Sequence, residues 1–291
     1  MPMSPEPRRE QSSTYFVQDR ANQEEMKRLQ LLDRTTTASM GGVLPEQPDP
    51  TIFRCVLDVG CGTGGWLIEL AQTSPDSTLL VGVDASRVCI EYAREQAAAA
   101  QVGDRVEFHV ADALRMLEFP AASFDLVNHR GAVSWLRTWD WPKLLQEYQR
   151  VARPDGVVRI TEGDIWTTNS PALSRLFALF LQAMYQSGHN FLPEGSGAAS
   201  ELVHLLQQHG LQRVQSRAYS LEFRPETPEG PRFFENIRMA YQTIMPFLRK
   251  WTRVPENYEE IYQQAMREMQ QPDFMATWNL LTAWGTVPSR E

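Results

Sequence analysis

The sequence has little of several features that would assign it to a special class of protein. Its 291 residues include only three cysteines, at positions 55, 61 and 89, and this spacing matches neither a metal site nor a disulfide framework. No apolar run approaches the length of a membrane-spanning helix. Acidic residues outnumber basic ones by 36 to 28, so a broad basic surface for nucleic acid is not expected. We therefore expect no metal, no nucleic-acid partner and no membrane anchor.

The first residues also lack the features of a targeting signal. Residues 1–11 are rich in proline, arginine and glutamate and contain no apolar stretch. We expect residues 1–12 to form a disordered tail on a cytoplasmic protein. Hydrophobic residues make up 42% of the chain, which is enough for a sizeable core in one globular domain with additions or in two small domains.

The middle of the chain alternates between short apolar runs and helical patterns. The apolar runs predict five strands, at 52–59, 78–83, 105–110, 124–129 and 157–162. The helical patterns between them predict helices at 64–73, 86–100, 113–117 and 140–152. This alternation indicates an α/β fold, in which helices cover both faces of a parallel sheet. Ligands bind such sheets at the carboxyl edge, where the parallel strands end.

The flanking regions are additions to this core. Residues 13–50 predict a cap of one or two amphipathic helices and a linker, and residues 51–165 form the core itself. Residues 166–200 read as a lid insertion with a helix over 171–188. Residues 201–291 contribute a helix and final strands, interrupted by a helical insertion over 225–272. The elements predicted in this last part are a helix at 201–209, a strand at 211–223, helices at 231–250 and 256–270, and a final segment at 274–287 that fits a strand or a helix.

The most informative stretch is a strand, a glycine-rich turn and a helix at residues 56–70. Gly60, Gly62 and Gly64 permit a backbone path that side chains would block. The turn therefore brings backbone N–H groups and a helix N-terminus against a ligand. Asp58 precedes the turn, and its carboxylate would repel a phosphate. A ligand that carries an ammonium or sulfonium charge suits this turn better.

Two further acids follow the next two predicted strands. Asp84 lies about two dozen residues beyond the turn, where a carboxylate reaches both hydroxyls of a ribose. Asp112 follows the third strand, within reach of an exocyclic amine such as that of adenine. Each acid alone is also explained as a turn or helix-capping residue. Their joint order across three neighbouring strand ends predicts a single bound nucleoside.

The motif spacing resembles that of the class I S-adenosylmethionine-dependent methyltransferases of the small-molecule type. Their first motif is an acid, one residue and Gly-x-Gly-x-Gly, as in residues 58–64, whereas nicotinamide sites favour Gly-x-Gly-x-x-Gly. The likeness covers residues 52–165 and includes the stretches 124–127 and 145–156. The resemblance implies a Rossmann-like, seven-stranded, mostly parallel sheet whose last strand is antiparallel. It also implies S-adenosylmethionine as cofactor and S-adenosylhomocysteine as product.

The resemblance assigns the cofactor contacts residue by residue. The methionyl part would lie along the turn, and Asp58 would face its amino group directly or through water. Asp84 would hold the ribose hydroxyls, and Asn128 would lie near the sulfonium. The complete set expected at the cofactor is Tyr15, Arg28, Asp58, Gly60, Cys61, Gly62, Gly64, Asp84, Ala85, Ser86, Asp112, Ala113, Asn128 and His129.

Methyl transfer needs a base only when the acceptor arrives protonated. His129 follows a strand end and is the first candidate, although a structural hydrogen bond explains it as well. His189, in the loop after the predicted lid helix, is the second. Glu162 ends the fifth strand and either orients the acceptor or makes a structural hydrogen bond. Arg130 would pair with an acidic acceptor or with Asp125.

The added segments carry many aromatic residues, most of which we expect to pack together. Those predicted to line an acceptor pocket are Trp135, Trp166, Tyr185, Phe234 and Tyr241. We therefore expect methylation of a small hydrophobic or aromatic molecule, with oxygen favoured over nitrogen or carbon, by a monomer or homodimer. The alternative is a protein of the same fold that binds the cofactor as a scaffold for a regulatory or non-methylating role.

Overall fold

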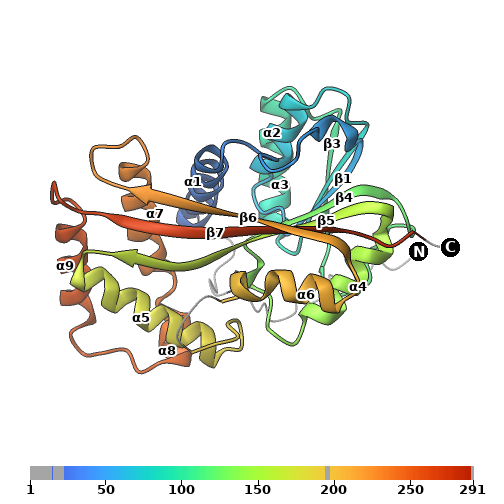
Figure 1. Ribbon diagram of the computed structural model, residues 1–291. Helices are drawn as coiled ribbons and strands as arrows, with labels where there is room; N and C mark the ends of the chain where they lie inside the picture. The colour runs from blue at the N-terminus through green and yellow to red at the C-terminus, as the bar shows by residue number, and fades with distance from the viewer. Residues whose placement is uncertain (1–14, 16–22, 194–196, 290–291) are drawn as a thin grey trace, which may run out of the picture.

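The computed structural model describes residue 15, residues 23–193 and residues 197–289. Seven strands form one sheet in the order β3-β2-β1-β4-β5-β7-β6 (Figure 1). The strands β1 to β5 run parallel to one another, and β7 runs antiparallel between β5 and β6. The described residues thus confirm the α/β, Rossmann-like, mostly parallel sheet expected from the sequence.

The core half of the sheet alternates with helices in chain order. Its strands are β1 (Cys55–Val59), β2 (Leu79–Asp84), β3 (Val106–Val110), β4 (Phe124–Arg130) and β5 (Ala152–Thr168). Helices α2 (Gly65–Thr73) and α3 (Arg87–Ala99) pack on one face of this sheet. Helices α4 (Trp141–Val151) and α6 (Leu202–Gln208) pack on the other face. Successive residues of β1 and β4 therefore point alternately into two buried clusters, as the period of a strand requires.

Three long strands carry the sheet beyond the carboxyl edge of the core (Figure 1). They are β5, β6 (Gln212–Phe223) and β7 (Ala276–Thr286), and β7 pairs with its two neighbours along most of its length. A third buried cluster surrounds this extension. Its helices are α5 (Pro171–Gln186), α7 (Gly230–Thr243), α8 (Met245–Trp251) and α9 (Tyr258–Glu268).

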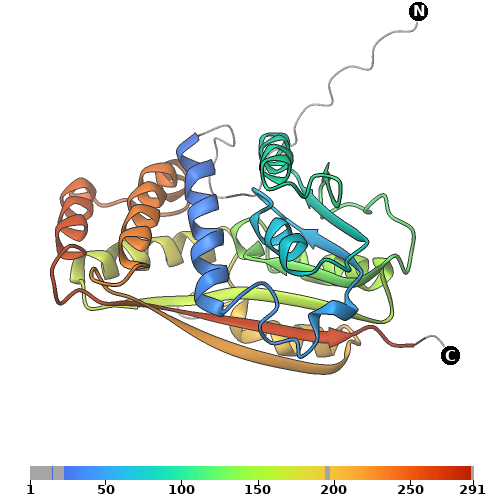
Figure 2. The same ribbon diagram turned by 90° about the horizontal axis from the view of Figure 1, so that it is seen from above.

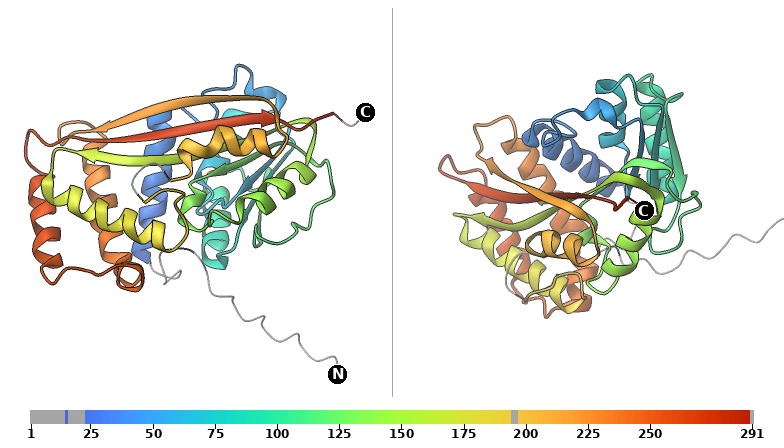
Figure 3. Two further views of the ribbon diagram at one scale, coloured as in Figure 1. Left: turned by 60° about the horizontal axis from the view of Figure 1, so that its bottom comes forward. Right: turned by 45° about the vertical axis from the view of Figure 1, so that its right-hand side comes forward.

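The N-terminal helix α1 (Gln23–Met40) lies between the core helices and the helices of the extension (Figure 2). On one side its Gln30 amide donates to the Gln96 side chain of α3 at 3.4 Å. On the other side Arg28 donates to Asn236 of α7 at 3.2 Å. The two further views in Figure 3 show the same placement. Helix α1 therefore touches both halves of the molecule.

The structure corrects three expectations about individual elements. Residues 113–117 form turns instead of a helix, because the Asp112 carboxylate accepts the Leu114 N–H at 3.0 Å and closes a turn. The helix expected at 231–250 is divided into α7 and α8, and Pro246 occupies the first turn of α8, where its missing N–H is tolerated. The fifth strand runs to Thr168 because residues 166–168 pair with β7.

Other expectations hold or fall outside the described residues. The final segment is strand β7, and the alternative of a helix is wrong. The expected tail at 1–12 lies outside the described residues, and only Tyr15 is described between residues 13 and 22. Within the described parts of the chain, no helix is both long and apolar enough to cross a bilayer.

Candidate active site

The glycine turn between β1 and α2 is held against the end of β2. The N–H groups of Gly60 and Cys61 both donate to the Val83 carbonyl, at 2.8 and 3.0 Å. Gly60, Gly62 and Gly64 all have positive φ values, between 53° and 77°. A Cβ atom on Gly64 would lie 2.7 Å from the Phe108 ring, so packing as well as backbone conformation requires glycine there.

The two acids predicted to bind a nucleoside lie on neighbouring strand ends. Half-buried Asp84 ends β2, and its two oxygens accept the N–H groups of Gly62 and Ser86 at 3.1 and 2.7 Å. Ala85 beside it is exposed. Asp112 follows β3 and is exposed, next to the half-buried Ala113. The structure thus places these residues along one edge of the sheet, together with the glycine turn.

A row of polar side chains crosses three strands beside this edge. Asp58 of β1 is in register with Asn128 of β4, which is in register with Arg159 of β5. The Asn128 amide donates to Asp58 Oδ1 at 2.8 Å, and its carbonyl accepts from Arg159 Nη1 at 2.7 Å. Arg159 also holds both oxygens of Glu46, at 2.6 and 3.1 Å. This chain of hydrogen bonds fixes the Asn128 amide so that its N–H faces Asp58.

The Asp58 carboxyl is a weaker acid than usual because it is almost fully buried. Burial raises its pKa to about 7, although the hydrogen bond from Asn128 and the charge of Arg159 lower it and the charge of Asp84 raises it. The Cys61 thiol and the Tyr148 phenol also lie within range of its charge. A carboxylate this poorly solvated gains strongly from a ligand cation at the turn.

His129 points to the opposite face of the sheet from Asn128, its neighbour in β4. Its side chain has no exposed surface, and its nitrogens lie 2.8 Å from the Tyr148 hydroxyl and 3.0 Å from Glu162 Oε1. Its ring is stacked between the indoles of Trp135 and Trp141. This placement favours a structural role, and its function as a base or cofactor contact stays a prediction.

Glu162 connects this aromatic stack to the turn that follows β4. It is fully buried, and besides His129 it accepts the N–H groups of Ala132 and Val133, at 2.7 and 3.3 Å. The turn that it stabilises leads to Trp135, whose indole lies against Gly60. Of the two roles expected for Glu162, the structure shows the structural one.

Helix α1 reaches the site through an ion pair between Asp33 and Arg130, at the end of β4. Arg130 also donates to Thr37 of α1 at 2.8 Å. The Asp33 carboxylate lies beside Gly65. The expected pairing of Arg130 with Asp125 is wrong, because Asp125 pairs with Arg153 instead. Asp33 therefore stands over the first turn of α2.

The remaining predicted residues are more scattered. Tyr15 and Arg28 form a cluster with Glu25, and Arg28 also contacts Asn236 of α7. His189 is buried and hydrogen-bonded to Ser187 at 2.7 Å. Trp166, Phe234 and Tyr241 belong to the cluster around the extension, whereas Tyr185 is exposed. Their roles at the site stay predictions.

Sequence reasoning missed Glu46, Arg159 and Asp33. Glu46 and Arg159 are 113 positions apart, so no local spacing connects them. The only available signal was an arginine in the middle of an apolar strand, because a buried arginine requires an acidic partner. Asp33 lies on an amphipathic helix where a charge is ordinary.

These residues fit S-adenosylmethionine. The buried carboxylate of Asp58 suits an ammonium group, the turn permits close backbone approach, and Asp84 is placed for a ribose. No set of three or more metal-ligating side chains occurs among the described residues. The site is thus defined by carboxylates and glycines at one sheet edge.

Comparison with known proteins agrees with S-adenosylmethionine as the cofactor. Residues 56–156 match the methyltransferase domain family. The chain is also 30% identical over 184 residues to demethylmenaquinone methyltransferase from Deinococcus radiodurans, across 58% of this chain and 71% of that protein. The chain belongs to the class I S-adenosylmethionine-dependent methyltransferases that act on small molecules, and S-adenosylmethionine is its cofactor.

Two further likenesses extend over most of the chain. The 27-O-demethylrifamycin SV methyltransferase of Amycolatopsis mediterranei is 26% identical over 253 residues, covering 87% of this chain and 78% of that protein. The structure of geranyl diphosphate C-methyltransferase from Streptomyces coelicolor A3(2) aligns with a TM-score of 0.51 at 15% identity, covering 93% of this chain and 87% of that chain. The second likeness concerns the fold alone.

The acidity of Asp58 predicts how cofactor binding depends on pH. Unfolded aspartate titrates near pH 3.9, so the folded protein without ligand holds this proton more tightly and loses stability as the pH rises from about 4 to about 7. A ligand ammonium favours the ionised form. We expect the increase in melting temperature caused by S-adenosylhomocysteine to grow between about pH 5.5 and about pH 8. Asp58→Asn should flatten this profile, and an unchanged profile in the variant would assign the titration to another group.

Replacement of Asp84 should weaken cofactor binding. Asp84→Asn keeps one acceptor for the backbone N–H groups but loses the charge, so we expect a loss of about 1–3 kcal/mol, measured by calorimetry with S-adenosylhomocysteine. The exposed Asp104→Asn serves as control. Equal affinities of the Asp84 variant and the control would contradict the ribose assignment.

Proposed function

We propose that this methyltransferase modifies a hydroxyl oxygen of a small, largely aromatic acceptor. The observation that carries this proposal is the extension of β5, β6 and β7 beyond the cofactor edge. Its helices surround a buried cluster that is rich in aromatic side chains. An apolar, aromatic surround of this kind favours an acceptor of the same character.

The choice of oxygen is supported by one relative. The name of the Amycolatopsis mediterranei protein refers to a methylated oxygen, and its likeness spans both the core and the added segments of this chain. Other relatives carry names that refer to a quinone precursor or to a nitrogen acceptor. The length of the first alignment gives it the greater weight for the acceptor side.

When bound, the cofactor supplies a methyl group that is already activated as a sulfonium. The chain's own residues then have to align the acceptor and exclude water. His129 and His189 are both buried and hydrogen-bonded, so an acceptor with an acidic hydroxyl, such as a phenol, suits this site better than an aliphatic alcohol. Substituting each histidine with glutamine tests the predicted roles as bases.

The test is incubation with methyl-labelled cofactor and a panel of matched phenols, alcohols, anilines and activated carbon acids. We expect label on phenolic oxygen. Label on nitrogen or carbon alone would replace the proposed acceptor type. Tight binding of S-adenosylhomocysteine without any labelled product would favour the scaffold alternative.

A further inference from the structure

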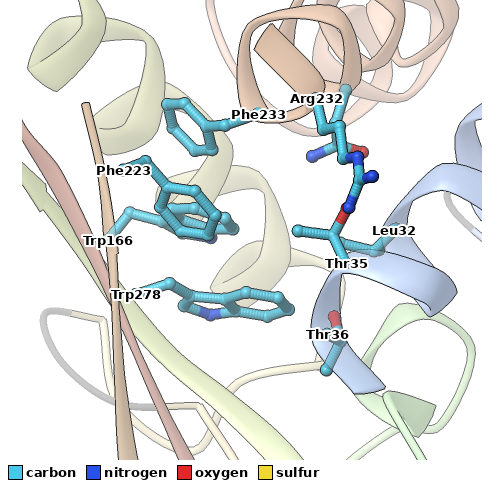
Figure 4. Close-up of a pocket in the computed structure, with 9 residues that line it drawn as sticks. Leu32, Thr35, Thr36, Trp166, Phe223, Arg232, Phe233 and Trp278 are labelled. Atoms are coloured by element: carbon cyan, nitrogen blue, oxygen red, sulfur yellow. The ribbon is translucent and has the colours of Figure 1, made fainter. Parts of the chain in front are cut away.

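A small, partly open cavity lies just beyond the carboxyl edge, between α1, α7 and the paired strands β5 and β7 (Figure 4). Its volume is about 10 Å³, which is room for one water-sized group. It begins close to the cofactor edge, because Thr36 lines it and the next residue, Thr37, binds Arg130 at the end of β4. Trp278 lies on the side of the cavity opposite Thr36, and its indole packs against Gly163 of β5.

One wall of the cavity is a stack of aromatic rings. Trp166 and Trp278 are directly paired across β5 and β7, with ring centroids 4.4 Å apart and planes within 11° of parallel. The Trp278 indole donates to the Asp164 carbonyl at 3.2 Å, which fixes its orientation. Phe233 of α7 packs 5.0 Å from Trp166. A wall that contains two parallel indoles, one of them fixed by a hydrogen bond, is suited to a flat aromatic ligand.

The facing wall carries a buried hydroxyl without a partner. Thr35 of α1 is 6% exposed, and its Oγ1 makes no hydrogen bond to any described residue. Buried polar atoms in folded proteins are nearly always paired, so an orphaned hydroxyl lining a cavity indicates a missing partner. Figure 4 shows Thr35 on the side of the cavity opposite the tryptophans.

The rim of the cavity carries a positive charge. Arg232 of α7 is exposed, and no hydrogen bond or ion pair joins it to any part of the chain that the structure describes. Its neighbour on the same helix, Arg238, is by contrast paired with Glu235. In a chain with a formal charge of −8, an arginine without an acidic partner beside an aromatic cavity favours an anionic ligand.

We propose that this cavity is the deep end of the acceptor site and that it selects planar aromatic acceptors bearing an acidic oxygen substituent. The ring stacks against Trp278, an oxygen at its edge hydrogen-bonds to Thr35, and the anionic group pairs with Arg232. The present cavity holds only a water-sized group, so entry of the ring requires the exposed Arg232 side chain to move outward. This inference rests on the proposed function, because it assumes that a methyl acceptor occupies the space beside the cofactor.

The test uses 6-hydroxy-2-naphthoate as the anionic probe and 2-naphthol as its neutral counterpart. Binding of each to the protein saturated with S-adenosylhomocysteine is measured by calorimetry, and methyl transfer is followed separately with labelled cofactor. Arg232→Gln should weaken binding of the naphthoate roughly tenfold and leave that of 2-naphthol unchanged. Arg249→Gln, an exposed arginine on α8, is the matched control.

Substitutions at two further positions test the contributions of the two walls of the cavity to binding. Thr35→Val should weaken both probes by roughly three- to tenfold, whereas Thr35→Ser should retain binding. Trp278→Leu should weaken both by roughly tenfold, and Trp278→Phe should restore most of the loss. Binding of S-adenosylhomocysteine alone should stay unchanged in all these variants, which shows that they fold.

The outcomes separate the inference from the proposed function. Probe binding that responds to these substitutions, without methyl transfer, would support the subsite and count against the proposed oxygen acceptor. Methyl transfer that none of the substitutions alters would support the proposed function and overturn the subsite. Failure of both probes to bind the loaded protein would also overturn it.

Discussion

Replacing Arg159 with methionine should lower the free energy of unfolding by about 3–5 kcal/mol, the usual cost of removing one partner of a buried ion pair. The Arg159 and Glu46 side chains are each only 1% exposed. Burial alone would raise the pKa of Glu46, but its hydrogen bonds and ion pair with Arg159 leave that pKa lowered. Without Arg159, the Glu46 carboxylate is left buried and unpaired, and Asn128 loses the contact that orients it. Urea denaturation measures the loss.

Two variants show whether the loss comes from the buried charge. Glu46→Leu combined with Arg159→Met removes both charges, and we expect it to recover a large part of the stability. Arg153→Met breaks the half-exposed pair with Asp125 and should cost less than about 1 kcal/mol. If Arg159→Met were no more destabilising than Arg153→Met, the polar row would have no structural importance.

Replacing Glu162 with alanine should also lower the free energy of unfolding by about 3–5 kcal/mol. The substitution leaves several polar groups without a hydrogen-bond partner in a fully buried environment. The Ala132 and Val133 N–H groups and the His129 ring all lose their acceptor. The turn that carries Trp135 should therefore loosen, and binding of S-adenosylhomocysteine should weaken together with the stability. Urea denaturation and calorimetry measure the two effects.

Glu162→Gln provides the sharper comparison, since its amide oxygen still accepts one or both backbone N–H groups. We expect it to recover more than half of the loss seen with alanine. Glu222→Ala, at an exposed ion pair with Arg224, is the surface control. A Glu162→Ala protein as stable as this control would show that the turn after β4 is held by other contacts.

The parts of the site that follow strand ends were predictable from the sequence. Asp58, the glycine turn, Asp84 and Asp112 follow apolar runs, and the carboxyl ends of parallel strands meet at one edge. Local order along the chain was therefore sufficient to place them together. The same reasoning identified the sheet, because alternating strands and helices allow few other arrangements.

The parts that depend on distant contacts were not predictable. The pairing of Glu46 with Arg159 arises because the linker before β1 crosses the sheet, and no spacing in the sequence records that path. The overrun of β5 to Thr168 needs β7 as its partner, which lies more than one hundred residues later. His129 was predicted to be a base because it lies at the end of a strand. Side chains alternate between the two faces of a strand, so His129 points toward α4 and is enclosed by Trp141 and Tyr148.

The continuous strands β5 and β7 also restrict how the enzyme can move. Their ladder extends from Val157 to Thr168, from the core into the extension formed by β5, β6 and β7, with one bulge between Gly163 and Trp166. A hinge between the two halves would have to break this ladder. The α1 helix, by contrast, contacts the core through side chains, among them Asp33 with Arg130 and Gln30 with Gln96. Separating α1 from the core would break side-chain contacts only, so opening the site costs less there than at the ladder.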